Sequence, residues 1–345
     1  MSKLDNLGNV LIRSDLNVPI KNGEITDNFR ILKSVEILES ILDKSRTITF
    51  TSHMGRPNGK DLNLSLRPVA ESMSDFLGKE VCFIKEVFGE KVEEQIEKSE
   101  SKIFLLENLR FEKGEIENDK DFSNQITKPF NSYIFDAFGA AHREHASVVS
   151  FGENLESFQG PLMDKEIHEL DRLLNNSESG YAVLLGGAKI SDKLNLIEKL
   201  LPKVEYLMVG GGMCFTLLKA LGHEIGRSLL EESFISKAEE LLNSRFGKKI
   251  ILPTDFGVTE SIDSSVRENV KLDDFKNNHI GVDIGPQTVS NFRKILKKSK
   301  NIFWNGPMGI FEKEAFSYGT KEITEIISNS SAYTCIGGGD SVSAI

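Results

Sequence analysis

The sequence predicts an α/β fold with parallel sheets, divided over two domains. Three observations support this prediction. Short apolar runs that suit buried strands alternate with amphipathic segments of helical spacing, as in consecutive βαβ units. The chain has 345 residues, about twice the length of a common single domain. Hydrophobic residues make up 39% and charged residues 27% of the chain, which is typical of a globular protein.

The first half alternates strands and helices. Apolar runs predict strands at residues 10–12, 47–51, 81–84, 103–106 and 133–135. Helices are expected at residues 29–42, 66–77, 87–96 and 122–130. In the first of these helices, Ile31, Val35 and Leu38 follow one another at helical spacing. The alternation predicts a parallel sheet in this half.

The second half begins with a longer amphipathic segment. Residues 158–174 predict a helix that joins two domains, and residues 175–180 (NNSESG) are the most linker-like stretch of the chain. Further strands are expected at residues 182–185, 206–209, 250–252, 302–304 and 333–336, and residues 281–286 are expected to form a loop or a short strand with a turn. These strands predict a second sheet whose strand ends are rich in glycine.

Charge and cysteine usage exclude several classes of protein. The net charge of −10 argues against a general nucleic-acid-binding protein, so an anionic ligand would need a local cluster of positive groups. Cys82, Cys214 and Cys335 are widely spaced in or beside apolar runs, so we expect buried, reduced thiols and a reducing compartment. The N-terminus lacks an apolar signal core and no apolar run reaches about 18 residues, so we expect a cytoplasmic protein without a membrane span.

Charged and polar residues follow the strands of the first half. Ligands of parallel sheets bind outside the carboxyl ends of the strands. The residues near these ends are Arg13, Asp15, Asn17, Arg30, His53, Arg56, Asn108, Arg110, Asp136, His142, Arg143 and His145. A single arginine or histidine in a loop is usually solvated or structural, but the repetition predicts a site for a small, multiply anionic ligand. A metal site at His142 and His145 is less expected, because no familiar ligand pattern surrounds them.

The first glycine turn of the second half lies at residues 186–187. It ends the strand at 182–185, and a helix is expected to begin near Lys189. Lys189 and Lys193 would then share one helical face beside the turn, which suits a polyphosphate. The alternative is a pair of solvated lysines on a surface helix.

A second glycine turn, at residues 337–340, favours the phosphate interpretation. Asp340 in this turn is a candidate ligand for Mg²⁺, which prefers a carboxylate together with phosphate oxygens. The chain contains neither G-x-x-x-x-G-K-[ST] nor G-x-G-x-x-G, which disfavours a P-loop NTPase and a standard dinucleotide-binding domain. A basic half and a glycine-rich half together suit direct phosphoryl transfer between two domains that close on each other.

Seven motifs, in chain order, closely resemble those of phosphoglycerate kinases. They are RSDLNVP at 13–19, TSHMGRP at 51–57, ENLRF at 107–111, DAFGAAHREH at 136–145, LGGAKISDK at 185–193, WNGPMGIFE at 304–312 and GGGDS at 337–341. The resemblance implies two Rossmann-like domains with parallel sheets that face a cleft across a hinge helix. The expected limits are 1–157 for the phosphoglycerate-binding domain, 158–175 for the hinge helix and 176–345 for the nucleotide-binding domain.

The resemblance also implies the reaction. Such an enzyme is a phosphotransferase that interconverts 1,3-bisphosphoglycerate and ADP with 3-phosphoglycerate and ATP, using Mg²⁺, in glycolysis. Its expected partners are these small-molecule substrates alone, without nucleic acid or membrane, and the expected state is a monomer.

Site residues follow from the resemblance position by position. The phosphoglycerate site would contain Asp15, Leu16, Asn17, Arg30, His53, Met54, Gly55, Arg56, Arg110, His142 and Arg143. The nucleotide site would contain Lys189, Lys193, Gly212, Gly281, Asn305, Glu312, Gly338, Gly339, Asp340 and Ser341. Arg30 and Lys193 would be catalytic, stabilising the phosphoryl group in transfer. Glu312 would hold the ribose hydroxyls, and Asp340 the metal.

Two departures from the family leave alternatives open. Ser341 stands where threonine is common, and the chain stops at Ile345, before a further glycine-rich loop and a tail that crosses back to the first domain. With only residues 342–345 left to form a helix, we expect residues 337–339 to be mobile and nucleotide binding to be weak. A catalytically weak fragment that still binds phosphoglycerate or nucleotide is therefore one alternative. A different acid kinase with an acyl-phosphate product is another.

Overall fold

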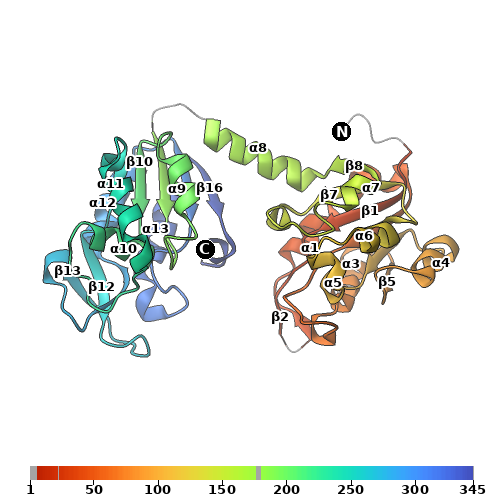
Figure 1. The fold of residues 1–345 in the computed structure, drawn as a ribbon, viewed down its shortest axis with the longest axis horizontal. Helices are drawn as coiled ribbons and strands as arrows, with labels where there is room; N and C mark the ends of the chain where they lie inside the picture. Colours follow the sequence, from red (N-terminus) through yellow and green to blue (C-terminus); the bar gives the residue numbers. More distant parts are fainter. Residues whose placement is uncertain (1–5, 22, 176–179, 345) are drawn as a thin grey trace. The chain divides into compact units, whose positions relative to one another are not determined.

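The chain folds into two units, seen here in a computed structural model that describes residues 6–21, 23–175 and 180–344. Unit 1 is Met1–His168 and unit 2 is Glu169–Ile345 (Figure 1). The boundary between them falls inside the long helix α8 (Pro161–Asn175), within the expected hinge segment 158–175. Of the expected linker, residues 176–179 lie outside the described residues.

Unit 1 is built on a six-stranded parallel sheet with the strand order β5-β6-β4-β1-β7-β8. Its strands are β1 (Gly8–Ser14), β4 (Ser45–Thr51), β5 (Val81–Ile84), β6 (Ile103–Leu106), β7 (Ser132–Asp136) and β8 (Glu156–Gln159), and a small hairpin joins β2 (Ile20–Lys21) to β3 (Glu24–Ile25). The five strands predicted for this half are confirmed. Strand β8 was not predicted, because its residues overlap the start of the expected helix at 158.

Helices cover both faces of the unit 1 sheet (Figure 1). One face packs against α1 (Phe29–Val35), α2 (Leu38–Ile41) and α3 (Arg67–Leu77), and the other against α4 (Glu90–Lys98), α6 (Lys120–Thr127) and α7 (Phe151–Asn154). The remaining short elements are α5 (Lys113–Ile116), η1 (Leu42–Lys44), η2 (Leu62–Leu64), η3 (Leu109–Phe111) and η4 (Phe138–Ala140). The helix expected at 29–42 is therefore interrupted between Val35 and Leu38, although its apolar face is buried as predicted.

Unit 2 contains a five-stranded parallel sheet with the order β11-β10-β9-β15-β16. Its strands are β9 (Tyr181–Leu185), β10 (Tyr206–Val209), β11 (Ile250–Ile251), β15 (Asn301–Asn305) and β16 (Tyr333–Gly337). Val183 and Leu185 point to the face covered by α9 (Leu194–Leu200), α10 (Met213–Ala220) and α11 (Ile235–Asn243). Ala182 and Leu184 point to the face covered by α12 (Pro286–Leu296) and α13 (Tyr318–Ser328).

A second, antiparallel sheet in unit 2 was not predicted. It has the order β13-β12-β14 and is formed by β12 (Asp255–Thr259), β13 (Glu268–Lys271) and β14 (Ile280–Ile284). Strand β14 occupies most of the segment that the sequence left open as a loop or short strand. The other short elements are η5 (Glu232–Phe234), η6 (Gly247–Lys249), η7 (Leu272–Asp274), η8 (Glu314–Phe316) and α14 (Gly339–Ser343).

Each unit thus has the helix-covered parallel sheet of a Rossmann-like domain, as predicted. Among the residues that the structure describes, no helix combines the length and apolar character needed to span a bilayer.

Candidate active site

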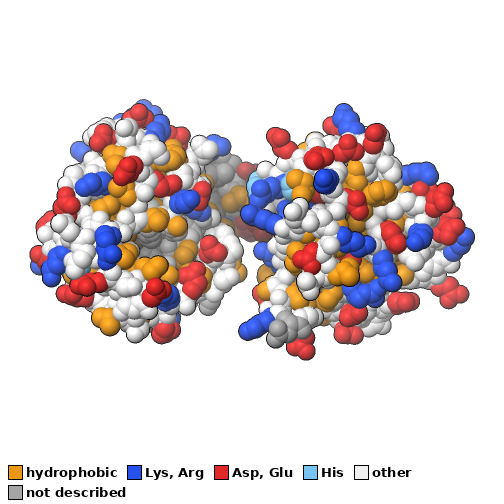
Figure 2. Space-filling view, turned by 60° about the horizontal axis from the view of Figure 1, so that its bottom comes forward, with side chains coloured by type: hydrophobic (Ala, Val, Ile, Leu, Met, Phe, Trp, Pro, Cys, Tyr) orange, Lys and Arg blue, Asp and Glu red, His pale blue; other side chains and the backbone are white. Residues whose placement is uncertain are grey.

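The carboxyl ends of neighbouring strands bring the basic residues of unit 1 together. Strands β6, β4, β1 and β7 are adjacent in the sheet, so the segments that follow them share one edge. Arg30, Arg56, His142 and Arg143 are exposed there. Figure 2 shows Lys, Arg and His side chains close to one another on the surface of unit 1. This surface can attract an anion.

Hydrogen bonds connect several of these segments to one another. The Arg30 guanidinium donates to an Asp15 carboxylate oxygen at 2.9 Å. The amide N–H of Gly55 donates to the side-chain oxygen of Asn17 at 2.9 Å, and Arg110 donates to the carbonyl oxygen of Gly55 at 2.6 Å. The segments after β1, β4 and β6 are therefore joined through Gly55, and a separate ion pair joins α1 to the segment after β1.

Leu16 and Met54 contribute differently from their polar neighbours. Both side chains are buried in the core of unit 1. Their amide N–H groups donate to Ser52 Oγ at 2.9 Å and to Asn108 Oδ1 at 3.1 Å. These two residues hold the shape of the loops, and their side chains do not reach the exposed surface.

His53 is almost fully buried and faces the Arg13 guanidinium. Burial, followed by the positive charges of Arg13 and Arg110, lowers the pKa of His53 to about 2. The imidazole is therefore neutral at physiological pH. The sequence places Arg13 near a strand end but does not reveal its role, since nothing in the sequence distinguishes a buried arginine from an exposed one.

In unit 2 the segment after β9 differs from its prediction. The helix begins at Leu194, not near Lys189, so Lys189 and Lys193 do not lie on one helical face. Backbone bonds hold this segment as a loop. Gly187, at φ +103°, donates to the carbonyl oxygen of Pro307 at 3.0 Å and accepts from the amide of Met213 at 3.1 Å.

The two lysines of this loop have different surroundings. Lys189 is exposed. Lys193 is partly buried and donates a hydrogen bond to the side-chain oxygen of Asn305, at the end of β15. Burial lowers the pKa of Lys193, while the carboxylates of Asp192 and Asp340 act in the opposite direction. Lys193 thus has a fixed position near the carboxyl end of the sheet.

The second glycine turn begins a short helix. Gly338 has a φ of +90° and precedes α14. Ser341 is buried, and its hydroxyl accepts a hydrogen bond from the amide of Gly306 at 2.6 Å. Gly339 and Asp340 are exposed. The turn is therefore attached to the loop after β15, with its glycines and its carboxylate accessible.

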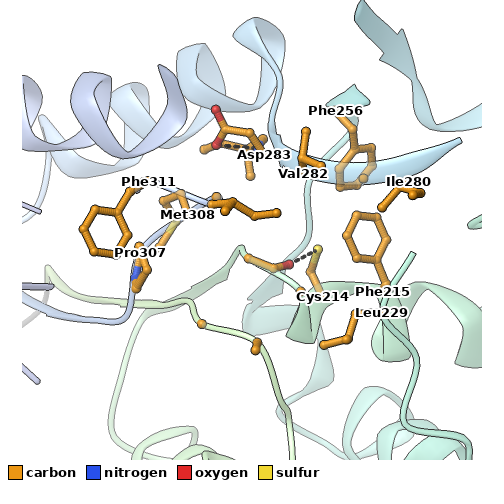
Figure 3. Close-up of a pocket in the computed structure, with 18 of the residues that line it drawn as sticks. Cys214, Phe215, Leu229, Phe256, Ile280, Val282, Asp283, Pro307, Met308 and Phe311 are labelled. Carbon is orange, nitrogen blue, oxygen red and sulfur yellow. Dashed lines mark hydrogen bonds between the residues drawn. The ribbon is translucent and has the colours of Figure 1, made fainter. Parts of the chain in front are cut away.

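A cavity of about 560 Å³ opens beside these loops in unit 2. Its wall is largely apolar, and Figure 3 shows Phe215, Phe256 and Ile280 along one side with Met308 and Phe311 on another. The lining also includes four residues of the predicted nucleotide site, Gly212, Gly281, Glu312 and Asp340. An apolar cavity with a few polar groups at its edge suits a flat, partly polar ligand.

Glycine at two of these positions is a steric requirement. A Cβ atom at Gly281 would overlap the Phe215 ring, and one at Gly212 would lie 2.8 Å from the carbonyl oxygen of Ala188. Larger residues would therefore change the cavity wall.

Asp283 is a buried carboxylate in the cavity wall that sequence analysis missed. It accepts hydrogen bonds from the amides of Gly319 at 2.7 Å and Ile284 at 2.9 Å, and Arg267 lies 3.7 Å away. Burial raises the pKa of Asp283 to about 7, against the lowering effects of these partners. Its partners come from β14, the segment before β13 and the start of α13, so only the tertiary structure reveals it.

The donors near the second glycine turn fit magnesium held together with a nucleotide. Asp340 is an exposed carboxylate on the lining of the cavity. The described residues contain no group of three His, Cys, Asp or Glu side chains able to hold a metal by themselves. Mg²⁺ commonly binds through one or two carboxylates and substrate phosphates, which is the donor set that Asp340 and a nucleotide would provide.

Comparisons with known proteins find phosphoglycerate kinases along nearly the whole chain. The phosphoglycerate kinase family model matches residues 4–345. The phosphoglycerate kinase of Dictyoglomus turgidum is 43% identical over 341 residues, covering 97% of this chain and 86% of that protein. The solved structure of phosphoglycerate kinase from Coxiella burnetii has a TM-score of 0.84 and 34% identity, covering 100% of this chain and 89% of the other. That of the Pyrococcus horikoshii OT3 enzyme has a TM-score of 0.86 and 29% identity, covering 99% and 88%.

Proposed function

This chain belongs to the phosphoglycerate kinase family, and we propose that unit 1 binds the phosphoglycerate of the family's reaction while unit 2 binds the nucleotide. The enzyme is a phosphotransferase of glycolysis: it transfers a phosphoryl group reversibly between 1,3-bisphosphoglycerate and ADP, giving 3-phosphoglycerate and ATP. The proposal rests on one observation, the different chemistry of the two units, since one presents a basic surface and the other an apolar cavity beside two glycine turns.

In unit 1, arginine and histidine side chains match a small ligand that carries phosphate and carboxylate. Arg56, Arg110 and Arg143 would supply planar guanidinium donors, which bind such oxygens in pairs. Asp15 and Asn17 would accept from the ligand hydroxyl and hold the neighbouring loops, and His53 would donate as a neutral imidazole. His142, also exposed, and the Gly55 backbone complete this proposed site.

In unit 2, the cavity would take the base and ribose of the nucleotide. Phe215 and Phe311 provide apolar surface for the base, and Glu312 would accept from the ribose hydroxyls. The phosphates would then extend toward the glycine turns at 186–187 and 338–339, where glycine allows a close approach to the backbone. Lys189 would add a flexible positive charge at this point.

Transfer itself requires charge stabilisation and the exclusion of water more than a protein nucleophile. We assign this stabilisation to Arg30 and Lys193. Mg²⁺ bound with the nucleotide would neutralise phosphate charge, and Asp340 would hold it, with Gly339 and Ser341 shaping the turn. Closure of domains 1–157 and 176–345 about the hinge helix 158–175 would bring the two sites together in a monomeric, cytoplasmic enzyme.

The similarity to phosphoglycerate kinases over nearly the whole chain favours an active enzyme over a protein that only binds phosphoglycerate or nucleotide. A coupled assay with ATP and either 3-phosphoglycerate, acetate or carbamate tests the assignment, and calorimetry measures each ligand separately. We expect turnover with 3-phosphoglycerate and none with acetate or carbamate. Binding of both ligands without turnover would support a protein that only binds them, and turnover with another acid would support a different acid kinase.

A further inference from the structure

Arg13 lies at the end of β1, where its side chain is buried beneath the basic surface of unit 1 with only 1% exposure. Its Nε donates to Ser147 Oγ at 2.9 Å, and its Nη1 donates to the carbonyl oxygen of Ser14. Its Nη2 lies 2.9 Å from His53 Nδ1. The guanidinium is therefore held from several directions and is directed at the imidazole.

The contact between Arg13 and His53 determines where the imidazole proton lies. A guanidinium has five N–H donors and no acceptor. His53 Nδ1 must then accept this bond, so a neutral His53 carries its proton on Nε2. A protonated imidazole would have N–H groups on both nitrogens, and one would point at another donor. The geometry thus excludes both the Nδ1–H tautomer and the imidazolium.

The charge of Arg13 is balanced within unit 1. Glu115, on α5, is fully buried and accepts from the amide and the hydroxyl of Ser147 at 2.9 and 2.6 Å. Ser147 thereby joins the carboxylate to the guanidinium, because its hydroxyl donates to Glu115 while accepting from Arg13. His145 lies 3.7 Å from the same carboxylate. Two opposite buried charges that share hydrogen bonds to one hydroxyl are costly to separate from one side, so Arg13 is firmly placed.

We propose that Arg13 is a positioning residue for phosphoglycerate: it fixes His53 as the neutral Nε2–H tautomer, so that His53 offers the ligand one constant hydrogen-bond donor. This inference rests on the proposed role of His53 in phosphoglycerate binding. Arg13 itself is too deeply buried to touch the ligand. Positive charge at the site comes instead from the exposed arginines.

The other charged groups around His53 act in the same direction. Arg110 on η3, Arg30 on α1 and His145 in the segment before α7 all lower the pKa of the imidazole, as burial and Arg13 do more strongly. The Glu115 carboxylate is linked to His53 only through Ser147 and Arg13, and it is not among the groups that shift the His53 pKa. His53 is therefore expected to remain neutral from pH 5.5 to pH 8.

Nitrogen-15 NMR of histidine-labelled, ligand-free enzyme tests the tautomer directly. His53→Gln identifies the resonance by its loss. The expected result is an Nε2–H signature that does not titrate between pH 5.5 and pH 8. An Nδ1–H signature, or a titration within this range, would overturn the proposal even if every variant below failed to fold.

Substitution of Arg13 separates positioning from packing. In Arg13→Met the bond to Nδ1 is lost, and His53 should show mixed tautomers and titrate at a higher pH than in the unaltered enzyme. Arg13→Lys keeps a charged donor and should restore the Nε2–H signature. Arg46→Met is the matched control, since Arg46 is an exposed arginine on β4. Identical His53 spectra in Arg13→Met and the unaltered enzyme would contradict the proposal.

Calorimetry with 3-phosphoglycerate then links the tautomer to binding. Arg13→Met should weaken binding at least about tenfold at pH 8 and less at pH 5.5, where His53 becomes charged. ADP affinity should not change. An equal loss at both pH values would show that Arg13 acts through packing alone. If the unaltered enzyme does not bind 3-phosphoglycerate, the proposed function fails, while the NMR result still decides the tautomer.

Discussion

Arg13 and Arg30 carry the same guanidinium group but differ in what surrounds it. Arg13 is buried and has four hydrogen-bonding partners within unit 1. The Arg30 side chain is 46% exposed and forms an ion pair with Asp15. An exposed ion pair of this kind contributes about 0–1 kcal/mol, so Arg30 can leave Asp15 for a ligand at little cost. At the scale of single residues, burial therefore distinguishes the arginine proposed to position His53 from the one proposed to meet the substrate.

Arg30→Ala should therefore lower turnover with little loss of stability. If the guanidinium stabilises charge that develops during transfer, kcat should fall about 10²-fold or more, on the order of 3 kcal/mol. The Michaelis constant for 3-phosphoglycerate should change much less. Steady-state kinetics beside an Arg46→Ala control measures this. An unchanged kcat with a raised Michaelis constant would restrict Arg30 to ground-state binding.

Asp283 gives a prediction for stability against pH. Its folded pKa of about 7 lies above the usual unfolded value near 3.9, so the folded state retains a proton that the unfolded chain releases. The contribution of Asp283 to the free energy of unfolding should thus fall as pH rises from about 4 to about 7, and remain constant above.

Urea unfolding of the unaltered enzyme and Asp283→Asn measures that contribution. The difference in free energy of unfolding, unaltered enzyme minus variant, should fall by on the order of 2–3 kcal/mol between pH 5 and pH 8. Asp263→Asn is the control, because the Asp263 side chain is 93% exposed. A difference that does not vary with pH would show that burial does not perturb Asp283.

At the scale of elements, the segment between β9 and α9 shows how loops acquire a function. Lys189 is exposed, whereas Lys193 is held by Asn305. A flexible positive charge suits binding of mobile phosphates, while a fixed one suits charge that appears at a defined point during transfer. The proposed division of roles between the two lysines therefore rests on their different surroundings, and not on a shared helical face.

Separate alanine substitutions should show this division. Lys189→Ala should mainly raise the Michaelis constant for ADP, while Lys193→Ala should mainly lower kcat. Lys203→Ala, at an exposed lysine elsewhere in unit 2, is the control. Steady-state kinetics of the three variants tests this. Equal increases of the Michaelis constant for ADP in Lys189→Ala and Lys193→Ala, with kcat unchanged, would exclude a division of roles.

Short buried strands were easier to predict from the sequence than the segment between β9 and α9. Strands β5, β6 and β10 have the predicted limits, because each is a short apolar run that is wholly or largely buried. The helix after β9 exists, but its predicted start near Lys189 was wrong, because Ile190 continues the helical spacing and yet is buried in a loop. Strand β13 (ENVK) has one buried residue and carries no apolar run.

The candidate site was also predicted only in part from the sequence. Motifs and strand ends pointed to the exposed arginines and to the glycine turns. Arg13 and Asp283 escaped assignment because their roles depend on partners distant in the chain. Arg13 and Ser147 are 134 residues apart, and Asp283 and Gly319 are 36 apart. Periodicity does not encode such pairs.

At the scale of the whole molecule, α8 is attached to both units. In unit 1 the amide of Met163, near its start, donates to a carboxylate oxygen of Asp136 at 2.9 Å. In unit 2 the Arg172 guanidinium, near its end, lies 3.7 Å from the centroid of the Tyr333 ring on β16. Strand β16 leads directly into the glycine turn at 337–340. We therefore expect a rotation of α8 to shift β16 and, with it, the glycine turn of the proposed phosphate site.

Arg172→Ala should consequently weaken the coupling between the units without disturbing either site. An exposed cation–π contact contributes about 0.5–1 kcal/mol, so turnover should fall by up to about fivefold. The affinities for 3-phosphoglycerate and for ADP, each measured alone by calorimetry, should stay within about twofold, since neither proposed site includes Arg172. Arg245→Ala removes a comparable contact, 4.4 Å from the Phe246 ring and away from α8, and should leave turnover unchanged. Equal turnover of the two variants would contradict this prediction, and so would a loss of ADP affinity alone in Arg172→Ala. In either case the contact between α8 and β16 would not contribute to coupling between the units.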